Sequence, residues 1–309
     1  MQQRITTKHL DIGYGAKVIQ HQLSLTACEG ELTALCGPNG AGKSTLLRTL
    51  CGLQPELGGE VTINGKRLKE MKDVERAKAM ALVLTDKIME DRLTVFDLVA
   101  MGRVPFLAWH GGLSKSDVEK TEQSLDQVGL LHKRNDRISN ISDGERQRVM
   151  VAKALAQETP IILLDEPTSH LDLPSRIEIT LLLKQLAHAT GKSIIMSTHE
   201  LDLAIQSADH IWLMNKNGVR AAVPEDLMIE GDMQSTFASD NFRFDDNDGH
   251  CVMTHTPNNL YAPVKVTGDS NKANWLRRAL LRSGFEISDL ANQQVEATGN
   301  SFTLPNGSS

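Results

Sequence analysis

One short segment combines glycines, a lysine and two hydroxyl side chains in a spacing that suits phosphate binding. It consists of Gly37, Pro38, Asn39, Gly40, Ala41, Gly42, Lys43, Ser44 and Thr45, and it fits the pattern G-x-x-x-x-G-K-[ST]. Glycines allow successive backbone N–H groups to turn inward around phosphate oxygens, and the following helix N-terminus adds its dipole. Lys43 has the reach to contact the β- and γ-phosphates as a catalytic residue, and the Ser44 hydroxyl suits Mg²⁺. The segment predicts a nucleoside triphosphate site.

Two adjacent carboxylates, Asp165 and Glu166, follow the apolar strand predicted at Ile161–Leu164. In open parallel sheets, ligands lie at the carboxyl ends of the strands, so both acids should face the phosphates. Asp165 is suited to hold the Mg²⁺ shell, and Glu166 to polarise the attacking water as a general base. A solvated acidic turn is the alternative, and the phosphate loop upstream disfavours it.

A second apolar strand, predicted at 194–197, leads directly to His199. Because this strand belongs to the same predicted sheet, His199 should end within reach of the γ-phosphate, where we expect it to polarise or sense the phosphate. The other histidines, such as His110, His132 and His188, are expected to be ordinary surface or core residues.

The elements that must position these residues follow from the distribution of apolar runs. The first 30 residues alternate short apolar runs with turns, which is typical of antiparallel strands, and Asn64-Gly65 predicts a hairpin turn. Residues 93–158 are mostly helical in pattern, and a helix at 174–189 separates the two apolar strands. This alternation predicts an α/β fold with a mainly parallel core sheet covered on both faces, an N-terminal antiparallel β-subdomain and a helical insert.

The composition changes near residue 225, and we expect a domain over 1–230 followed by a linker and a small α+β segment over 231–309. Residues 240–249 are rich in aspartate and are expected to form a solvated loop. Beyond them the pattern predicts a strand at 262–269, a helix at Ser270–Arg282, and short strands at 293–298 and 301–304. Whether this segment buttresses a dimer, regulates it or is a passive extension stays open.

Composition restricts the classes of function. The 309 residues include 33 lysines and arginines against 39 aspartates and glutamates, so the formal net charge of −6 disfavours a dedicated nucleic-acid binder. The longest apolar stretches fall far below the roughly 20 residues of a membrane-spanning helix, and the N-terminus lacks the apolar core of a signal peptide. The four cysteines form no CxxC pair, and free thiols in a reducing compartment are expected. His250, Cys251 and His255 fit no regular zinc spacing.

Taken together, the motifs resemble those of the ATP-binding subunits of ABC transporters, over roughly residues 4–230. The phosphate loop is similar to their Walker A motif, the strand ending in Asp165 and Glu166 to Walker B, residues 169–172 to the D-loop, and His199 to the switch histidine. Tyr14 stands where the family keeps an aromatic residue that stacks on adenine. The resemblance implies an ATP hydrolase of the P-loop NTPase fold that uses ATP and Mg²⁺.

Residues 141–147 resemble the family's signature motif. Ser142 begins a predicted helix at 144–157 and offers a hydroxyl beside free N–H groups, although a simple helix cap is the alternative. The resemblance implies that Ser142 and Gly144 bind the γ-phosphate of ATP held by another subunit. With one nucleotide-binding unit in the chain, the resemblance implies a head-to-tail homodimer.

Three acids depart from the family pattern. Asp86 stands at the usual glutamine of the Q-loop, and we expect it to hold water or Mg²⁺. Asp143 and Glu145 stand where glycine and glutamine are usual in the signature. A carboxylate near phosphates costs Coulomb energy, so we expect Arg146 and Arg148 to offset these two acids.

The segment between the Q-loop position and the signature resembles the subfamily that imports iron-siderophores, haem or cobalamin. Gly102, Arg103 and Pro105 carry this resemblance together with Trp109 and Asp117. It implies two membrane permease subunits, an extracytoplasmic substrate-binding protein, and a peripheral place at the cytoplasmic face of the inner membrane.

In related transporters the helical region docks on the permease, and exposed Phe106 and Trp109 would suit that contact. No nucleic-acid partner is expected. The alternatives are a soluble ABC ATPase that acts on nucleic acid or ribosomes, and an exporter subunit.

Overall fold

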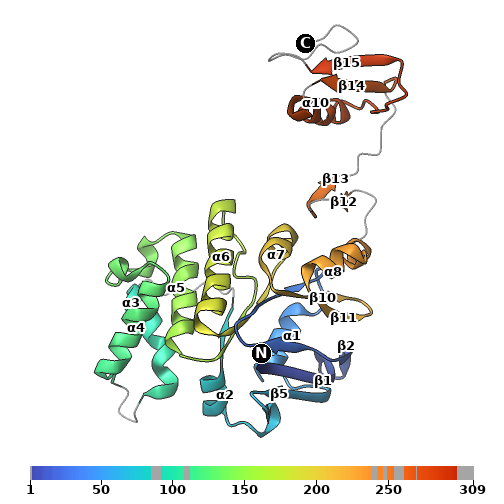
Figure 1. The fold of residues 1–309 in the computed structure, drawn as a ribbon. Coiled ribbons are helices and arrows are strands. Elements are labelled where there is room, and N and C mark those ends of the chain that lie inside the picture. Colours follow the sequence, from blue (N-terminus) through green and yellow to red (C-terminus); the bar gives the residue numbers. More distant parts are fainter. Residues whose placement is uncertain are drawn as a thin grey trace. The chain divides into compact units, whose positions relative to one another are not determined.

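The computed structural model describes residues 2–84, 92–107, 112–237, 242–245, 249–253, 261–268 and 270–297. Asp86, Trp109, His110, His255 and residues 301–304, all discussed above, lie outside these ranges. The chain forms two compact units: residues 1–237 with 246–249, and residues 238–245 with 250–309 (Figure 1). In the described part of the chain, no helix is long and apolar enough to cross a membrane.

A six-stranded sheet forms the centre of the first unit, in the order β11-β10-β4-β9-β8-β7. Its neighbours are parallel except for the antiparallel pair of β10 and β11. The strands are β4 (Leu32–Cys36), β7 (Met80–Val83), β8 (Ile161–Leu164), β9 (Ser193–Ser197), β10 (His210–Asn215) and β11 (Gly218–Ala222). Every residue of β4, β8 and β9 is buried, as expected for central parallel strands with both faces covered. The predicted parallel core sheet is therefore confirmed.

The longest helix of the first unit has clear start and stop signals. This helix, α6 (Leu173–Thr190), joins β8 to β9; Asp172 accepts a hydrogen bond from the Ser175 N–H at its start, and Gly191 ends it with φ 66°. The other helices of the first unit, outside residues 93–158, are α1 (Lys43–Leu50), α2 (Asp73–Ala79), α7 (Leu201–Ser207), α8 (Pro224–Ile229) and α9 (Asp232–Thr236).

The N-terminal strands form a separate antiparallel sheet, as predicted. They are β1 (Gln3–Tyr14), β2 (Lys17–Leu23), β3 (Thr26–Cys28), β5 (Gly58–Ile63) and β6 (Lys66–Arg67), with a short 3-10 helix η1 (Leu68–Glu70) after them. Asn64 and Gly65 have φ values of 48° and 81°, which the tight turn between β5 and β6 requires. Leu46 and Leu47 of α1 belong to one apolar core with residues of both sheets, so the antiparallel sheet holds α1 in place.

Residues 93–158 are mostly helical, as predicted, and they lie together on one side of the first unit (Figure 1). The elements are α3 (Val95–Ala100), η2 (Met101–Phe106), α4 (Lys115–Gln127), η3 (Leu131–Lys133), η4 (Ile138–Asn140) and α5 (Asp143–Ala156). A serine or threonine caps α3, α4 and α5, and an acid three residues later returns the hydrogen bond.

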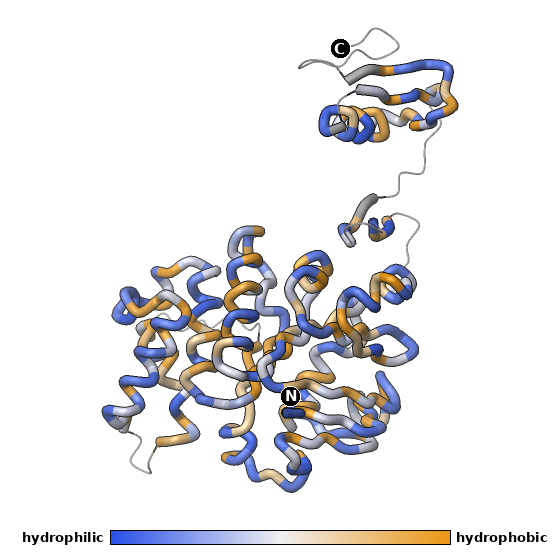
Figure 2. Tube along the Cα trace, in the orientation of Figure 1, coloured by the Kyte–Doolittle hydropathy of each residue, from blue (hydrophilic) through white to orange (hydrophobic). Residues whose placement is uncertain are grey.

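The second unit has its own apolar core. Its helix α10 (Ser270–Arg282) shows hydrophobic and hydrophilic residues on different sides (Figure 2). Val264, Val266, Leu276, Leu280, Phe285 and Val295 are among the buried core residues. The parallel strands β14 (Val264–Gly268) and β15 (Gln293–Ala297) complete it.

One expectation for this unit is wrong. Inside the expected loop at 240–249, β12 (Phe242–Phe244) pairs with β13 (Cys251–Met253). The alternation of Phe242, Arg243 and Phe244 is a strand pattern, and Phe244 is buried.

Candidate nucleotide-binding site

The phosphate loop connects β4 to α1, and its conformation requires glycine. Gly40 and Gly42 have φ values of 77° and 110°. A Cβ atom at Gly37 would lie 2.4 Å from the Met214 carbonyl oxygen. No side chain caps α1, so the first backbone N–H groups of the helix are left for another acceptor. This arrangement has the backbone geometry of an anion site.

Lys43 is buried within this loop. Its Nζ donates to the Gly37 carbonyl at 2.8 Å and to the Pro38 carbonyl at 3.3 Å. Burial lowers the pKa of Lys43, while the nearby carboxylates of Glu166 and Asp165 oppose that shift. The ammonium therefore lies at the centre of the loop with acids of the neighbouring strand facing it.

The acid at the end of β8 lies against the phosphate loop. Asp165 Oδ1 accepts hydrogen bonds from Ser44 Oγ at 3.0 Å and from Ser197 Oγ at 2.7 Å. A hydroxyl and a carboxylate are the oxygen ligands that Mg²⁺ prefers, so Ser44 and Asp165 fit that ion. No group of three or more histidines, cysteines or acids gathers as a metal site among the described residues.

Glu166 and His199 contact each other across the ends of β8 and β9. Their Oε1 and Nε2 atoms are 2.6 Å apart, and both side chains are partly exposed. The Glu166 N–H donates to Ser197 Oγ at 2.9 Å. Glu166 has a φ of 50°, a strained conformation for a residue with a side chain, which the surrounding hydrogen bonds hold. A carboxylate with a histidine partner at the mouth of a phosphate loop is able to orient and polarise water.

A cavity of about 310 Å³ brings most of the predicted residues together. Its lining consists of Tyr14, Ile19, Asn39, Gly40, Gly42, Lys43, Ser44, Thr45, Glu166 and His199. Tyr14 is about half exposed, and its hydroxyl accepts a hydrogen bond from Thr45 Oγ1 at 3.1 Å. The sequence reasoning missed Ile19, an ordinary strand residue without a signal. It also missed Ser197, although a hydroxyl at the carboxyl end of a predicted core strand could have indicated it.

Ser142 and Gly144 lie elsewhere, at the start of α5, and do not line this cavity. Ser142 is a helix cap: its Oγ accepts from the Glu145 N–H at 3.2 Å. A Cβ atom at Gly144 would lie 2.9 Å from Ser175 Oγ on α6, so glycine allows α5 to approach that helix.

The acids of the signature segment have ion-pair partners, but only one is the expected arginine. Arg146 pairs with Asp143 at 3.0 Å. Glu145 pairs instead with Lys133 at 2.6 Å. The Lys133 ammonium and the Ser142 N–H lower the pKa of Glu145 to about 2. Arg148 points elsewhere and pairs with Glu178 at 3.6 Å, so its expected role in offsetting these acids was wrong.

Phe106 was expected to be exposed, and this is also wrong. Phe106 is only partly exposed, and its ring centroid lies 4.3 Å from the Arg103 guanidinium and 5.0 Å from Lys78 Nζ. Arg103 itself is buried and bonds to Asp117 at 2.9 Å, to Glu158 at 2.8 Å and to the Ala156 carbonyl. Contacts with two cations give the aromatic residue a structural role here.

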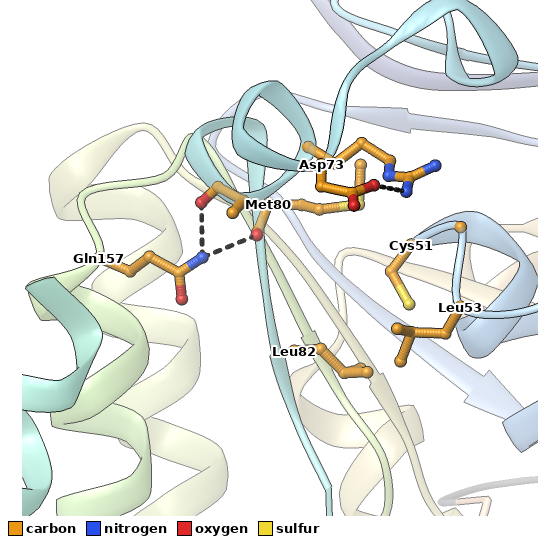
Figure 3. A pocket seen from close by; sticks show the side chains of 9 residues that line it. Cys51, Leu53, Asp73, Met80, Leu82 and Gln157 are labelled. Carbon is orange, nitrogen blue, oxygen red and sulfur yellow. Dashed lines mark hydrogen bonds and ion pairs between the residues drawn. The ribbon is translucent and has the colours of Figure 1, made fainter. Parts of the chain in front are cut away.

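A second pocket of about 370 Å³ holds none of the predicted site residues. Its lining is Cys51, Gly52, Leu53, Asp73, Arg76, Ala77, Met80, Leu82 and Gln157. Figure 3 shows the Gln157 amide reaching the loop end of α2, where it donates to the Ala77 and Met80 carbonyls. Most of the exposed surface of this pocket is apolar.

Comparison with known proteins supports the resemblance drawn from the motifs. Residues 20–169 match the family model for ABC transporters, and residues 261–308 match the iron ABC transporter C-terminal domain. An uncharacterized ABC transporter ATP-binding protein of Methanocaldococcus jannaschii is 35% identical over 284 residues, which cover 92% of this chain and 98% of that protein. The iron(3+)-hydroxamate import ATP-binding protein of Bacillus subtilis is 37% identical over 215 residues, covering 70% and 80%.

The fold also has close counterparts among solved structures. An ATP-binding cassette of an ABC transporter in its ADP conformation has a TM-score of 0.69 at 19% identity, with 77% of this chain and 99% of that chain covered. At this identity the likeness concerns the fold alone. The sequence relatives extend over most of both chains, and on that ground this chain belongs to the family of ABC transporter ATP-binding proteins.

Proposed function

We propose that this chain is the ATP-hydrolysing subunit of an ABC importer, with iron-siderophore complexes as the first candidate cargo and haem or cobalamin as related ones. The hydrolytic part rests on one observation, the convergence of Lys43, Glu166 and His199 on one cavity. The cargo rests on the import relative of Bacillus subtilis and on the C-terminal match to a domain of iron transporters.

ATP would lie in this cavity with its phosphates against the loop of residues 37–45. Tyr14, which lines the cavity, would stack on the adenine once its hydroxyl leaves Thr45, and Lys43 would contact the β- and γ-phosphates. Ser44 and Asp165 are the residues that would hold Mg²⁺, with Asp86 as a further candidate ligand. When bound, the ion supplies neutralisation of phosphate charge.

Hydrolysis then needs an oriented water beside the γ-phosphate. Glu166 is the residue we propose as the base that polarises this water, since its carboxylate lines the cavity. His199 lies 2.6 Å from that carboxylate, fixes its direction and is itself within the lining of the cavity. Charge that develops on the phosphate would be met by Lys43.

We propose a homodimer in which Ser142 and Gly144 of each copy meet the γ-phosphate held by the other. Neither residue lines the cavity of its own chain, and this supports the arrangement, because both are then available to bind the nucleotide of the other copy. The start of α5 also carries the positive end of the helix dipole, which favours an anion.

Two membrane permease subunits would complete the transporter, with an extracytoplasmic substrate-binding protein acting through them. The chain would lie peripherally at the cytoplasmic face of the membrane, with no nucleic-acid partner. Because Phe106 is occupied within the fold, exposed Leu53 and Val74 beside the second pocket and exposed Val104 on η2 are better candidates for the permease contact.

Replacing Lys43 with alanine tests the nucleotide site directly. We expect Lys43→Ala to lose ATP hydrolysis by at least about a hundredfold, because the main cation facing the phosphates is removed. Steady-state phosphate release measures this, with exposed Lys66→Met as the matched control that should keep the parent rate. Parent-like hydrolysis by Lys43→Ala would overturn the assignment of the site.

A further inference from the structure

A buried glutamine on β2 contacts the phosphate loop from outside the cavity. The Gln20 side chain is 3% exposed. Its Nε2 lies 3.0 Å from the Ala41 carbonyl oxygen and 2.7 Å from the Asn215 carbonyl oxygen. Carbonyl oxygens only accept hydrogen bonds, so both contacts use the two hydrogens of the side-chain amide. Gln20 thus joins three elements: the antiparallel sheet, the phosphate loop and the end of β10.

The hydrogen bond to Ala41 fixes the direction of the next backbone N–H group. The Ala41 carbonyl and the Gly42 N–H belong to the same peptide group, and no cis peptide bond occurs in the described ranges. In a trans peptide group the C=O and N–H bonds point in opposite directions. With its carbonyl held at Gln20, this group directs the Gly42 N–H away from Gln20, and Gly42 lines the cavity.

The loop needs such a restraint because its own sequence does not supply one. Gly42 has a φ of 110°, and glycine passes easily between backbone conformations, so the peptide group before it can rotate at little cost. A side chain at this position would be strained at that φ, and its Cβ atom would lie 3.1 Å from Ile19 Cγ2, closer than ordinary van der Waals contact. The peptide group before Gly42 is therefore free to rotate unless a neighbouring side chain holds it.

We propose that Gln20 is a positioning residue for nucleotide binding, which holds the Ala41–Gly42 peptide group with its N–H toward the phosphates. This inference rests on the proposed nucleotide site. A backbone N–H that contacts a phosphate of the bound nucleotide does so in the ground state and the transition state alike. Loss of the restraint should therefore raise Kd and KM and leave kcat nearly unchanged.

The variant Gln20→Met tests this role, because methionine keeps the length of the side chain and cannot donate. We expect ADP to bind about five- to tenfold more weakly by calorimetry, the loss of about one hydrogen bond's net contribution. The KM for ATP should rise by the same factor, and kcat should stay within about twofold.

Leu23→Ala is the matched control for stability, because Leu23 is also buried on β2 and its apolar side chain cannot donate a hydrogen bond to the loop. It should lower Tm while leaving the Kd for ADP at the parent value. The inference is overturned if Gln20→Met binds ADP as the parent does while Lys43→Ala does not. It is equally overturned if Leu23→Ala weakens ADP binding as much as Gln20→Met at the same loss of Tm. If the parent itself binds no ADP, the proposed function fails and the inference fails with it.

Discussion

Asp165 and Glu166 are adjacent in sequence, but their surroundings give them different chemistry. Asp165 is buried and accepts from the hydroxyls of Ser44 and Ser197, which keeps one of its oxygens beside the phosphate loop. Glu166 is partly exposed and faces His199. A buried, hydroxyl-bound carboxylate suits a cation, whereas an accessible carboxylate beside a histidine suits water.

The negative charge of Glu145 lies at the start of α5, where we expect a phosphate of the nucleotide bound by the partner subunit. Its carboxylate is half of an ion pair with Lys133, and it also accepts from the Ser142 N–H at 3.0 Å. The lysine therefore offsets a negative charge that would otherwise repel a phosphate.

We expect Lys133→Met to weaken ATP-dependent dimerisation about tenfold, measured by sedimentation in a Glu166→Gln background. Adding Glu145→Gln should restore it, because the amide oxygen still accepts from the Ser142 N–H without carrying charge. Lys66→Met, which removes an exposed ion pair on the antiparallel sheet, should have no effect. An unrestored double variant would contradict this electrostatic explanation.

At the scale of elements, the Gly102-Arg103-x-Pro105 segment holds the helices of the helical region together. Arg103 on η2 bonds to Asp117 on α4 and to Glu158 just after α5, so one buried guanidinium ties three helices together. Gly102 has no room for a side chain, because a Cβ atom would lie 2.2 Å from the Lys153 carbonyl oxygen on α5.

The stability that the Arg103–Asp117 ion pair contributes should depend on pH. The Ser114 hydroxyl, the Ser114 N–H and the Arg103 guanidinium lower the pKa of Asp117 from 3.8 to about 2. The ionised form therefore contributes stability that is complete above about pH 3.8 and is lost as the pH falls toward 2.

Asp117→Asn should lower the free energy of unfolding by about 2–3 kcal/mol at neutral pH, because it removes charge from a buried pair. In urea unfolding, the difference in free energy of unfolding between the parent and Asp117→Asn should become smaller between about pH 4 and pH 2.5. Asp126→Asn, an exposed acid on the same helix, is the matched control with no such change. A difference that stays constant with pH would contradict the assignment.

Much of this arrangement could be predicted from the sequence, because local patterns carry it. The glycine spacing, the apolar strands before Asp165 and His199, and the serine that begins α5 are all short-range signals. The partners of Arg103, Glu145 and Gln20 could not be predicted, since they depend on residues brought together by the fold. The hairpin of β12 and β13 was missed because the surrounding aspartates outweighed a three-residue alternation.

For the whole molecule, the two units have separate cores, and each matches a different family model. The first unit holds every residue of the candidate site that the structure describes. The second is a small α+β unit, whose helix was predicted correctly at Ser270–Arg282 because its apolar positions follow helical spacing and Gly284 stops it. The match of the second unit to an iron transporter domain supports the proposed cargo and does not bear on the hydrolytic residues.

The most direct test of the central claim is affinity capture of the Glu166→Gln protein from its native membranes with ATP and Mg²⁺, followed by mass spectrometry. Because this variant should bind ATP without completing hydrolysis, we predict that it retains its membrane partners, and that a polytopic permease is recovered with it. Lys43→Ala provides the control, which should recover less of that permease. Recovery of ribosomal or DNA-associated proteins in place of a permease would contradict the importer.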